Sequence, residues 1–277
     1  MTAKYFLLAG AALACTAIAS PAAAQDAFQG PYVSVFGGLN AVRDQAADSL
    51  VFDTDRDGAF DDTVRTATGE NAFGPGFCNS GVDGATRPCL REGRGAEYGA
   101  RVGYDMRVGG GPFLVGGIAE ISRSEVTDST TGFSTTPASY TVSREMDYAL
   151  SARARAGFVL DESVLVYGTG GVSWAKIDHS FATTNTANSF TEVNDDKLRR
   201  GWQYGGGVEF ALSPSITLGA EYLRSSYRDR NYLVEVGPGT AGPTNPFLLD
   251  NPEGTDLRPS STNLRTQGFR VSGSLRF

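Results

Sequence analysis

An acidic segment contains the first residues whose types and spacing suggest chemistry. Residues 53–58 read D-T-D-R-D-G, and carboxylate oxygens at alternate positions before a glycine match the first half of a calcium-binding loop. The second half does not match, because Val64 occupies the position where an EF-hand places a bidentate glutamate. We therefore expect either a looser calcium site or an acidic loop that binds divalent ions weakly or not at all. The candidate ligands are Asp53, Asp55, Asp57, Asp61 and Asp62.

Two cysteines, Cys78 and Cys89, lie in a polar, glycine-rich segment of the chain. Neither belongs to a C-x-x-C motif and no histidine is near them in the sequence, which argues against a metal site. In an exported protein, a pair of this kind usually forms a disulfide. We expect a disulfide between them.

The single histidine, His179, precedes Ser180 and is the only candidate for a catalytic imidazole. Nucleophilic catalysis needs the base and the hydroxyl within hydrogen-bonding distance of each other. Adjacent residues on a strand point to opposite faces, so these two side chains cannot readily meet. We expect a surface histidine and a protein that is not an enzyme.

These residues lie within or between segments that alternate strictly between apolar and polar side chains. The last segment, 267–277, places apolar side chains on one face and arginines and serines on the other. This two-residue period predicts β-strands whose faces see different solvents. Each segment is about ten residues long, as a tilted strand needs to cross a bilayer. The eight predicted strands are 32–42, 98–108, 113–122, 146–158, 164–176, 202–212, 216–222 and 267–277.

The connections between these strands alternate between short and long. The segments 109–112, 161–163 and 213–215 are short turns, whereas the connection 43–97 is the longest of the others. Segregation of loop length by end is typical of a transmembrane barrel with short periplasmic turns and long extracellular loops. The sequence therefore predicts an all-β protein, an eight-stranded antiparallel transmembrane barrel whose apolar face meets lipid.

One face of the predicted strands carries many charged side chains. An eight-stranded barrel is barely wide enough for its own side chains, and a buried charge is costly unless it is paired. We expect Arg–carboxylate pairs that plug the lumen; the alternative is a narrow ion pathway in which Glu120, Glu209 and Arg153 exchange partners. The predicted lumen charges are Arg101, Asp105, Arg107, Glu120, Arg153, Arg155, Glu209, Glu221, Arg270 and Arg276.

The N-terminal segment has the features of an export signal. Lys4 precedes the apolar run 5–18, and the small residues 22–24 supply a cleavage site. We expect residues 1–24 to be a cleaved signal peptide and residues 25–277 to form the barrel domain. The net charge of −7 argues against a nucleic-acid partner.

The signal peptide, the eight alternating strands, the loop pattern and the terminal Phe277 resemble the OmpA-like, opacity-type family of small outer-membrane β-barrels. The resemblance implies the outer membrane of a Gram-negative bacterium and insertion by the outer-membrane assembly machinery, which reads an aromatic-ended last strand. The corresponding residues here are Phe269, Val271, Leu275 and Phe277.

The family resemblance leaves several functions open. We expect a structural or surface-interacting role, with a narrow porin for ions or small solutes as the alternative and a lipid-modifying enzyme as a distant third. The sequence names no partner for the outer loops. Arginines near the outer rim suggest contact with lipopolysaccharide phosphates, or ordinary solvated loop ends. They are Arg199, Arg200, Arg224, Arg228 and Arg230.

Overall fold

The computed structural model describes residues 27–43, 48–82, 84–85, 89 and 94–277. The predicted signal peptide, 1–24, lies outside the described residues. Within these ranges no helix has the length and apolar character needed to cross a membrane. The elements are β1 (Gly30–Val42), β2 (Leu50–Asp53), β3 (Gly76–Cys78), β4 (Gly95–Arg107), β5 (Phe113–Ser124), β6 (Thr127–Ser134), β7 (Ala138–Leu160), β8 (Val164–Thr183), β9 (Ser189–Val193), β10 (Asp196–Ser213), β11 (Ile216–Arg228), β12 (Leu233–Gly237), the 3-10 helix η1 (Pro246–Leu248), β13 (Thr255–Pro259) and β14 (Asn263–Arg276).

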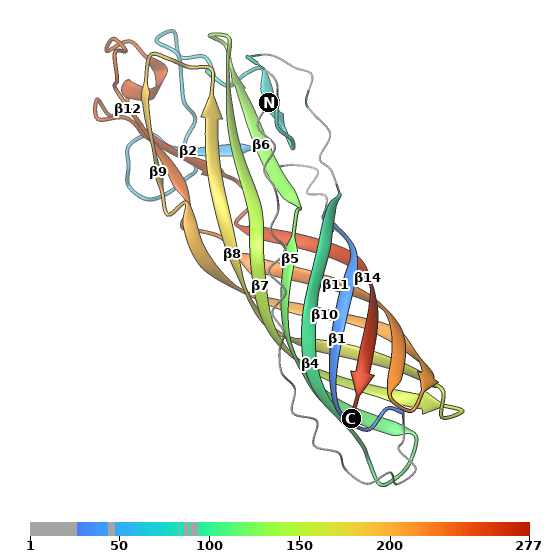
Figure 1. Ribbon diagram of the computed structural model, residues 1–277. Helices are drawn as coiled ribbons and strands as arrows, with labels where there is room; N and C mark the ends of the chain where they lie inside the picture. Colours follow the sequence, from blue (N-terminus) through green and yellow to red (C-terminus); the bar gives the residue numbers. More distant parts are fainter. Residues whose placement is uncertain (1–26, 44–47, 83, 86–88, 90–93) are drawn as a thin grey trace.

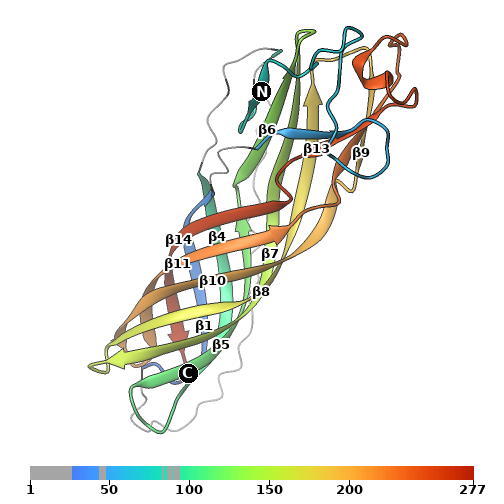
Figure 2. The same ribbon diagram turned by 180° about the vertical axis from the view of Figure 1, so that it is seen from behind.

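Eight strands close into an antiparallel barrel (Figures 1 and 2). They follow the order β7-β5-β4-β1-β14-β11-β10-β8, and pairing of β7 with β8 completes the ring. The first and last barrel strands are neighbours, since β1 pairs with β14 over eleven residue positions. Each barrel strand contains or overlaps one of the eight predicted segments, so the predicted fold class is confirmed.

The two faces of the barrel have the predicted polarity. Val35 is 69% exposed and Phe269 is 55% exposed on the outside, whereas Arg270, the next residue after Phe269, is 2% exposed on the inside. Only a barrel that meets lipid gains from an apolar exterior, because water would penalise so large an apolar surface. The inward face is correspondingly polar.

Alternation alone did not give the correct register of two strands. In β7, a register shift between Met146 and Tyr148 turns Met146 inward, although the uninterrupted pattern placed both on one face. Such a bulge adds one residue to one strand and reverses the alternation beyond it. In β8, whose register the sequence left open, Trp174 faces outward, whereas Leu165 and Tyr167 are buried.

The long connections fold into a cap at the end of the barrel opposite the C-terminus (Figure 1). β7 and β8 continue past the barrel, and β6 and β3 extend their sheet; β2, β13, β12 and β9 form a second, four-stranded sheet. Much of this region therefore forms sheet structure that the eight predicted strands did not include. The cap has its own hydrophobic core, formed by Leu50, Phe52, Val64, Ala72, Phe73, Ala138, Tyr140, Val142, Tyr232, Val234, Val236, Phe247 and Leu257.

A smaller apolar cluster lies at the other end of the barrel, where the short turns are. The starts of β5 and β8 and the end of β7 contribute buried side chains to it. The members of this cluster are Phe28, Leu114, Val159, Leu165 and Tyr167. A further apolar cluster lies on the inward face near the cap, formed by Val126, Met146, Ala149, Ala175, Ile177, Tyr227 and Leu264.

Candidate functional site

A network of ion pairs crosses the middle of the barrel. Arg270 donates to both carboxylate oxygens of Glu97, at 3.0 and 2.5 Å, and to Glu120 Oε1 at 2.6 Å. Glu120 also accepts from Arg153 at 2.7 Å. The six residues of this tier come from β4, β5, β7, β11 and β14, and they are Glu97, Arg101, Glu120, Arg153, Glu221 and Arg270.

A second tier of charges lies nearer the turn end. Arg155 donates from Nε to Asp105 at 2.7 Å and from Nη1 to Glu209 at 2.6 Å. Arg276 donates to the same two carboxylates, each at 2.9 Å. The ring of Tyr32 lies against both guanidinium groups, with its centroid 5.0 Å from Arg155 and 4.5 Å from Arg276. Two cations and two anions thus form a closed ring stacked on an aromatic side chain.

The two tiers balance their charges, with five arginines facing five carboxylates, and all ten side chains are buried. Nine of the ten predicted lumen charges lie in these tiers. Arg107 does not, because it lies at the turn end and donates to Glu162 of the β7–β8 turn at 2.7 and 3.1 Å. Sequence reasoning missed Glu97, although its even spacing from Arg101 continues the inward alternation by two more steps.

A third cluster closes the mouth of the barrel beneath the cap. Asp229 accepts from His179 Nε2 at 2.7 Å, and Arg199 Nε lies 2.9 Å from its other oxygen. Arg144 lies 3.7 Å from Asp229 and forms a close ion pair with Asp128. Burial alone would raise the pKa of Asp229, but the hydrogen bond from His179 and the two arginines lower it overall. Asp229 therefore carries a negative charge at neutral pH.

The expectation of a surface histidine is wrong, because the His179 side chain is fully buried. β8 continues to Thr183 instead of ending near residue 176, and this extension carries the imidazole under the cap. Nδ1 lies 3.0 Å from the backbone oxygen of Asp195, and the ring stacks on Tyr232 at 4.1 Å. Ser180 is exposed, as the opposite orientation of neighbouring strand residues requires. His179 thus serves as a structural link between β8 and the cap.

We expect Asp48 to make the stability of the cap region depend on pH. Burial, together with the charge of Asp128, raises the pKa of Asp48 to about 6, against the opposing effects of Arg144 and Arg265. A raised carboxyl pKa means that the folded protein favours the protonated form, so the free energy of unfolding should increase as the pH falls from about 7 to about 5. In Asp48→Asn this increase should disappear, and the variant should be more stable than the wild type at neutral pH. Urea unfolding followed by near-ultraviolet circular dichroism measures both effects; an unchanged pH dependence in Asp48→Asn would contradict the assignment.

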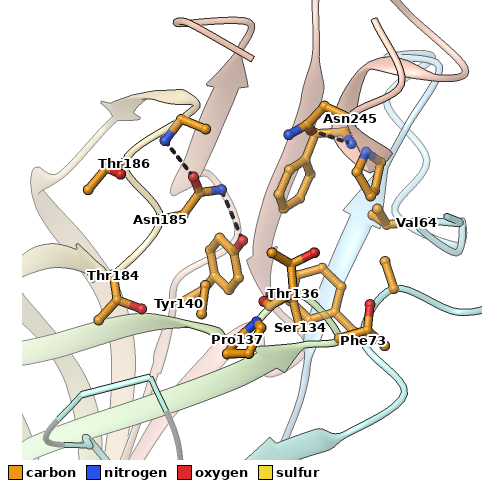
Figure 3. A pocket seen from close by; sticks show the side chains of 16 residues that line it. Val64, Phe73, Ser134, Thr136, Pro137, Tyr140, Thr184, Asn185, Thr186 and Asn245 are labelled. Atoms are coloured by element: carbon orange, nitrogen blue, oxygen red, sulfur yellow. Dashed lines mark hydrogen bonds between the residues drawn. The ribbon is translucent and has the colours of Figure 1, made fainter. Parts of the chain in front are cut away.

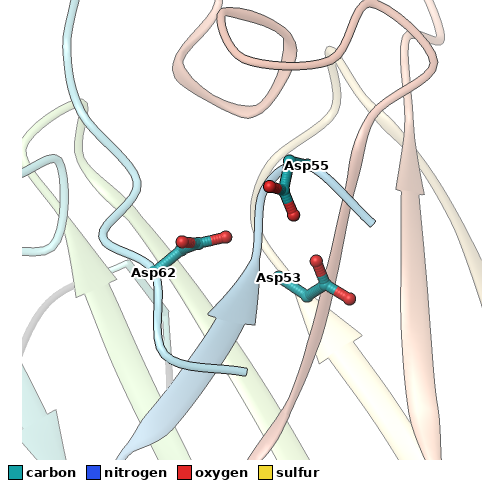
Figure 4. Close-up of side chains that lie close together, drawn as sticks. All are labelled: Asp53, Asp55 and Asp62. Carbon is teal, nitrogen blue, oxygen red and sulfur yellow. The ribbon is translucent and has the colours of Figure 1, made fainter. Parts of the chain in front are cut away.

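Three of the five predicted calcium ligands lie together at the end of β2 (Figure 4). Carboxylate oxygens of Asp53, Asp55 and Asp62 lie within 4.8 Å of one another. Asp57 is not among the three clustered carboxylates, but its backbone N–H donates to Asp53 at 3.1 Å. Asp61 is exposed and lies outside the cluster. Calcium binding by this cluster stays a prediction.

We expect calcium to bind this cluster with a dissociation constant of about 10⁻⁴–10⁻³ M, the range of extracellular modules with few carboxylates. Asp55→Asn should weaken binding by about tenfold or more, since it removes one of three anionic ligands. Asp61→Asn is the matched control, because Asp61 is an exposed neighbour outside the cluster. Calorimetric titration with calcium distinguishes the two variants. Equal affinities of the two variants, or no heat with the wild-type protein, would contradict a calcium site at this cluster.

The structure joins Cys78 and Cys89 in a disulfide, with their Cα atoms 6.3 Å apart. Cys78 ends β3, which pairs with β6, and Cys89 forms a bridge with Val82. The disulfide therefore fastens part of the long connection 43–97 to the extended sheet of the cap.

A pocket of about 240 Å³ opens in the cap, lined by the ends of β6 and β7, the segment after β8 and the η1 helix (Figure 3). Phe73, Tyr140 and Phe247 supply its apolar walls. Asn185 donates to the Tyr140 hydroxyl at 3.0 Å, and Asn245 accepts from the backbone of Phe247 at 3.0 Å. The volume is below that of typical drug-sized ligand sites. The sequence did not predict this pocket, because its walls come from separate connections.

The predicted assembly residues lie where the resemblance requires them. Phe269, Val271, Leu275 and Phe277 are exposed on the outer face of the last strand and its end. β14 pairs with β1 on one side and β11 on the other, so no edge of it remains open over the paired residues. Recognition by an assembly machinery stays a prediction.

Comparisons with known proteins agree with this architecture. The family described as outer membrane protein beta-barrel domain matches residues 10–277. The 31 kDa outer-membrane immunogenic proteins of Brucella melitensis biotype 1 and Brucella suis biovar 1 are each 37% identical over 86 residues, which cover 31% of this chain and 35% of theirs. The chain therefore matches about a third of the length of these curated relatives.

A solved structure shows the same fold at low sequence identity. The outer membrane protein OprG from Pseudomonas aeruginosa is similar with a TM-score of 0.50 and 10% identity, over 90% of this chain and 98% of OprG. The outer membrane protease OmpT from Escherichia coli gives a TM-score of 0.42 and 9% identity, over 90% of this chain and 96% of OmpT, and carries no conclusion about catalysis. With the family match over most of its length, the chain belongs to the outer-membrane β-barrel family and resides in the outer membrane of a Gram-negative bacterium.

Proposed function

We propose that this protein is a closed, non-enzymatic barrel that holds a folded cap at the cell surface, where the cap contacts external partners. The observation that carries this proposal is the pair of balanced charge tiers in the lumen. Five arginines and five carboxylates are buried in the lumen and form ion pairs with one another.

The charge tiers oppose conduction through their mutual bonding. An ion that crosses the lumen must separate pairs such as Arg270–Glu97 and Arg155–Asp105, each of which is buried and doubly hydrogen-bonded. Breaking a buried pair costs several kcal/mol unless the separated groups find new partners. The apolar cluster lies on the turn side of these tiers, and the His179–Asp229 cluster lies on their cap side. This arrangement supports a closed lumen.

The cap supports a surface role because it is a folded unit with its own core. Phe73 packs against Phe52, Tyr140 and Phe247, and the disulfide and two sheets fix the connections around them. A rigid surface loses less conformational entropy when it binds than mobile loops do. The Brucella relatives are named as immunogenic outer-membrane proteins, which agrees with exposure of such a surface.

The non-enzymatic part of the proposal rests on His179, the single histidine. Both of its ring nitrogens lie against oxygens, one of Asp229 and one of the Asp195 backbone, and Tyr232 covers a ring face. Such an imidazole has no free nitrogen to accept a proton from a nucleophile. These contacts support a structural assignment for the histidine and disfavour the lipid-modifying alternative.

Solute uptake by proteoliposomes tests the closed state. Vesicles with the refolded protein should swell no faster in isotonic arabinose or in a potassium salt than vesicles without protein. A general porin reconstituted at the same protein-to-lipid ratio shows that the vesicles respond. Swelling that rises with the amount of protein would instead establish the narrow porin.

A further inference from the structure

A groove on the outside of the barrel gathers arginines from three separate parts of the chain. It has a volume of about 340 Å³, and residues of β10, β11 and β14 line it. These three strands are neighbours in the barrel (Figure 2). Trp202 and Tyr204 form part of its wall. The arginines that line it are Arg43, Arg224, Arg228, Arg230 and Arg265.

The positive charge of this groove is not balanced by close ion pairs, although Arg265 interacts with Asp48 at longer range. No carboxylate lines the groove, and none of its five arginines forms an ion pair within 4.0 Å with an acid of the described residues. This contrasts with the lumen, where every arginine of the two tiers is paired. It also contrasts with the chain as a whole, whose net charge is −7. An anionic ligand from outside the protein would supply the missing charge.

Aromatic side chains fix the depth of the groove in the membrane. Trp202 and Tyr204 stack at 5.0 Å, and both are exposed on the outer face together with Tyr222. Arg224 donates to the Tyr222 hydroxyl at 3.1 Å and to the Tyr204 hydroxyl at 3.5 Å. Aromatic girdles of barrels lie at the headgroup level. The guanidinium groups therefore lie where the apolar band of the barrel ends and the outer-leaflet headgroups begin.

We propose that this groove binds the phosphate groups of the phosphorylated glycolipid of the outer leaflet. Guanidinium groups pair with phosphate oxygens in a bidentate manner, and the exposed rings of Trp202 and Tyr204 pack against the sugar and acyl portions of the same molecule. The arginines that line the groove differ from the rim arginines that the sequence suggested. Arg199 is buried against Asp229 and Arg200 does not line the groove, whereas Arg43 and Arg265 join it. The inference rests on the orientation of the barrel and not on whether its lumen conducts.

Fluorescence of Trp202 provides a direct binding measurement. The chain has two tryptophans, so Trp174→Phe leaves Trp202 as the only one. Titration of this variant in detergent with diphosphoryl lipid A should change its fluorescence saturably. Adding R224Q, R228Q and R265Q should weaken binding by about tenfold or more, because this variant removes three charge-assisted contacts to phosphate. Adding R200Q instead should leave the affinity unchanged, since Arg200 is exposed two residues from Trp202 but outside the groove.

Titration with two further ligands shows whether the fluorescence change of Trp202 requires the phosphate groups, the lipid, or both. Lipid A without phosphates should bind at least about tenfold more weakly than diphosphoryl lipid A, and inorganic phosphate alone should not saturate the site at the same concentrations. Equal binding of the dephosphorylated lipid would overturn phosphate recognition. Saturation by inorganic phosphate would overturn the assignment to a lipid, and an unchanged affinity of the triple variant would overturn the site itself.

The triple variant should fold, because its three arginines lie on the outer face and form no ion pair with the described acids. Far-ultraviolet circular dichroism checks this directly. Should it fail to fold, the same titration with R228Q alone tests the site, since Arg228 is exposed at the end of β11. A smaller but measurable loss of affinity is then expected, and no loss would contradict the proposal.

Discussion

Replacing Arg270 with methionine is expected to destabilise the barrel by about 3–5 kcal/mol, the cost of removing one partner from a buried ion pair. The guanidinium of Arg270 neutralises Glu97 and Glu120 at once, and its side chain is 2% exposed. Methionine has a similar length but no charge, so the loss measures electrostatics more than packing. Urea unfolding in detergent, followed by the strand signal in far-ultraviolet circular dichroism, measures the change.

Two variants make the Arg270 prediction specific. R270M/E97Q removes one of the stranded carboxylates and should recover part of the lost stability. R123M is the surface control: Arg123 is exposed and pairs with Asp147 at 3.3 Å, and its loss should cost about 1 kcal/mol or less. If R270M were no more destabilising than R123M, the lumen charges would not be the buried, mutually dependent network described above.

Replacing Phe73 with alanine is expected to destabilise the cap by about 3–5 kcal/mol, as for a large aromatic side chain removed from a packed core. Phe73 lies at the centre of the cap, with ring centroids 4.5 Å from Phe52, 5.2 Å from Tyr140 and 6.0 Å from Phe247. Of these partners only Tyr140 belongs to a barrel strand, and it lies on the part of β7 that pairs with β6 in the cap. The loss should therefore appear as faster hydrogen exchange and proteolysis in the cap, with the barrel strands still protected.

Phe60→Ala is the control for the cap prediction. Phe60 is half-buried and packs over Arg258 at 4.0 Å outside the cap core, so its removal should have a smaller effect. Equal effects of the two substitutions, or loss of barrel protection in Phe73→Ala, would show that the cap is not an independently packed unit.

Alternation predicted the barrel because each barrel strand lies between two environments that demand opposite side chains. Val35 meets lipid while Ser34 and Phe36 face the lumen, and the same contrast repeats around the ring. This constraint acts on each residue locally, so a single strand reveals it without knowledge of its neighbours. Nine of the ten predicted lumen charges were placed correctly for the same reason.

Features that depend on contacts between distant segments could not be predicted this way. Phe73, Tyr140 and Phe247 come from three different connections, and none lies in an alternating segment long enough to reveal a cap. Burial of His179 follows from contacts with Asp229 and Tyr232, about 50 residues further along the chain. The arginine-lined groove on the outside of the barrel likewise brings Arg43 near Arg265. Local patterns carry no information about such pairings.

The measurement that tests the central claim most directly is the conductance of the purified, refolded protein in planar lipid bilayers. Because the two charge tiers fill the lumen with mutually bonded side chains, the protein should add no steady current to that of the bare bilayer over the voltages that the bilayer tolerates. Reproducible, stepwise and long-lived current increments that scale with the amount of protein would show an open lumen and would contradict a barrel sealed by its own ion pairs.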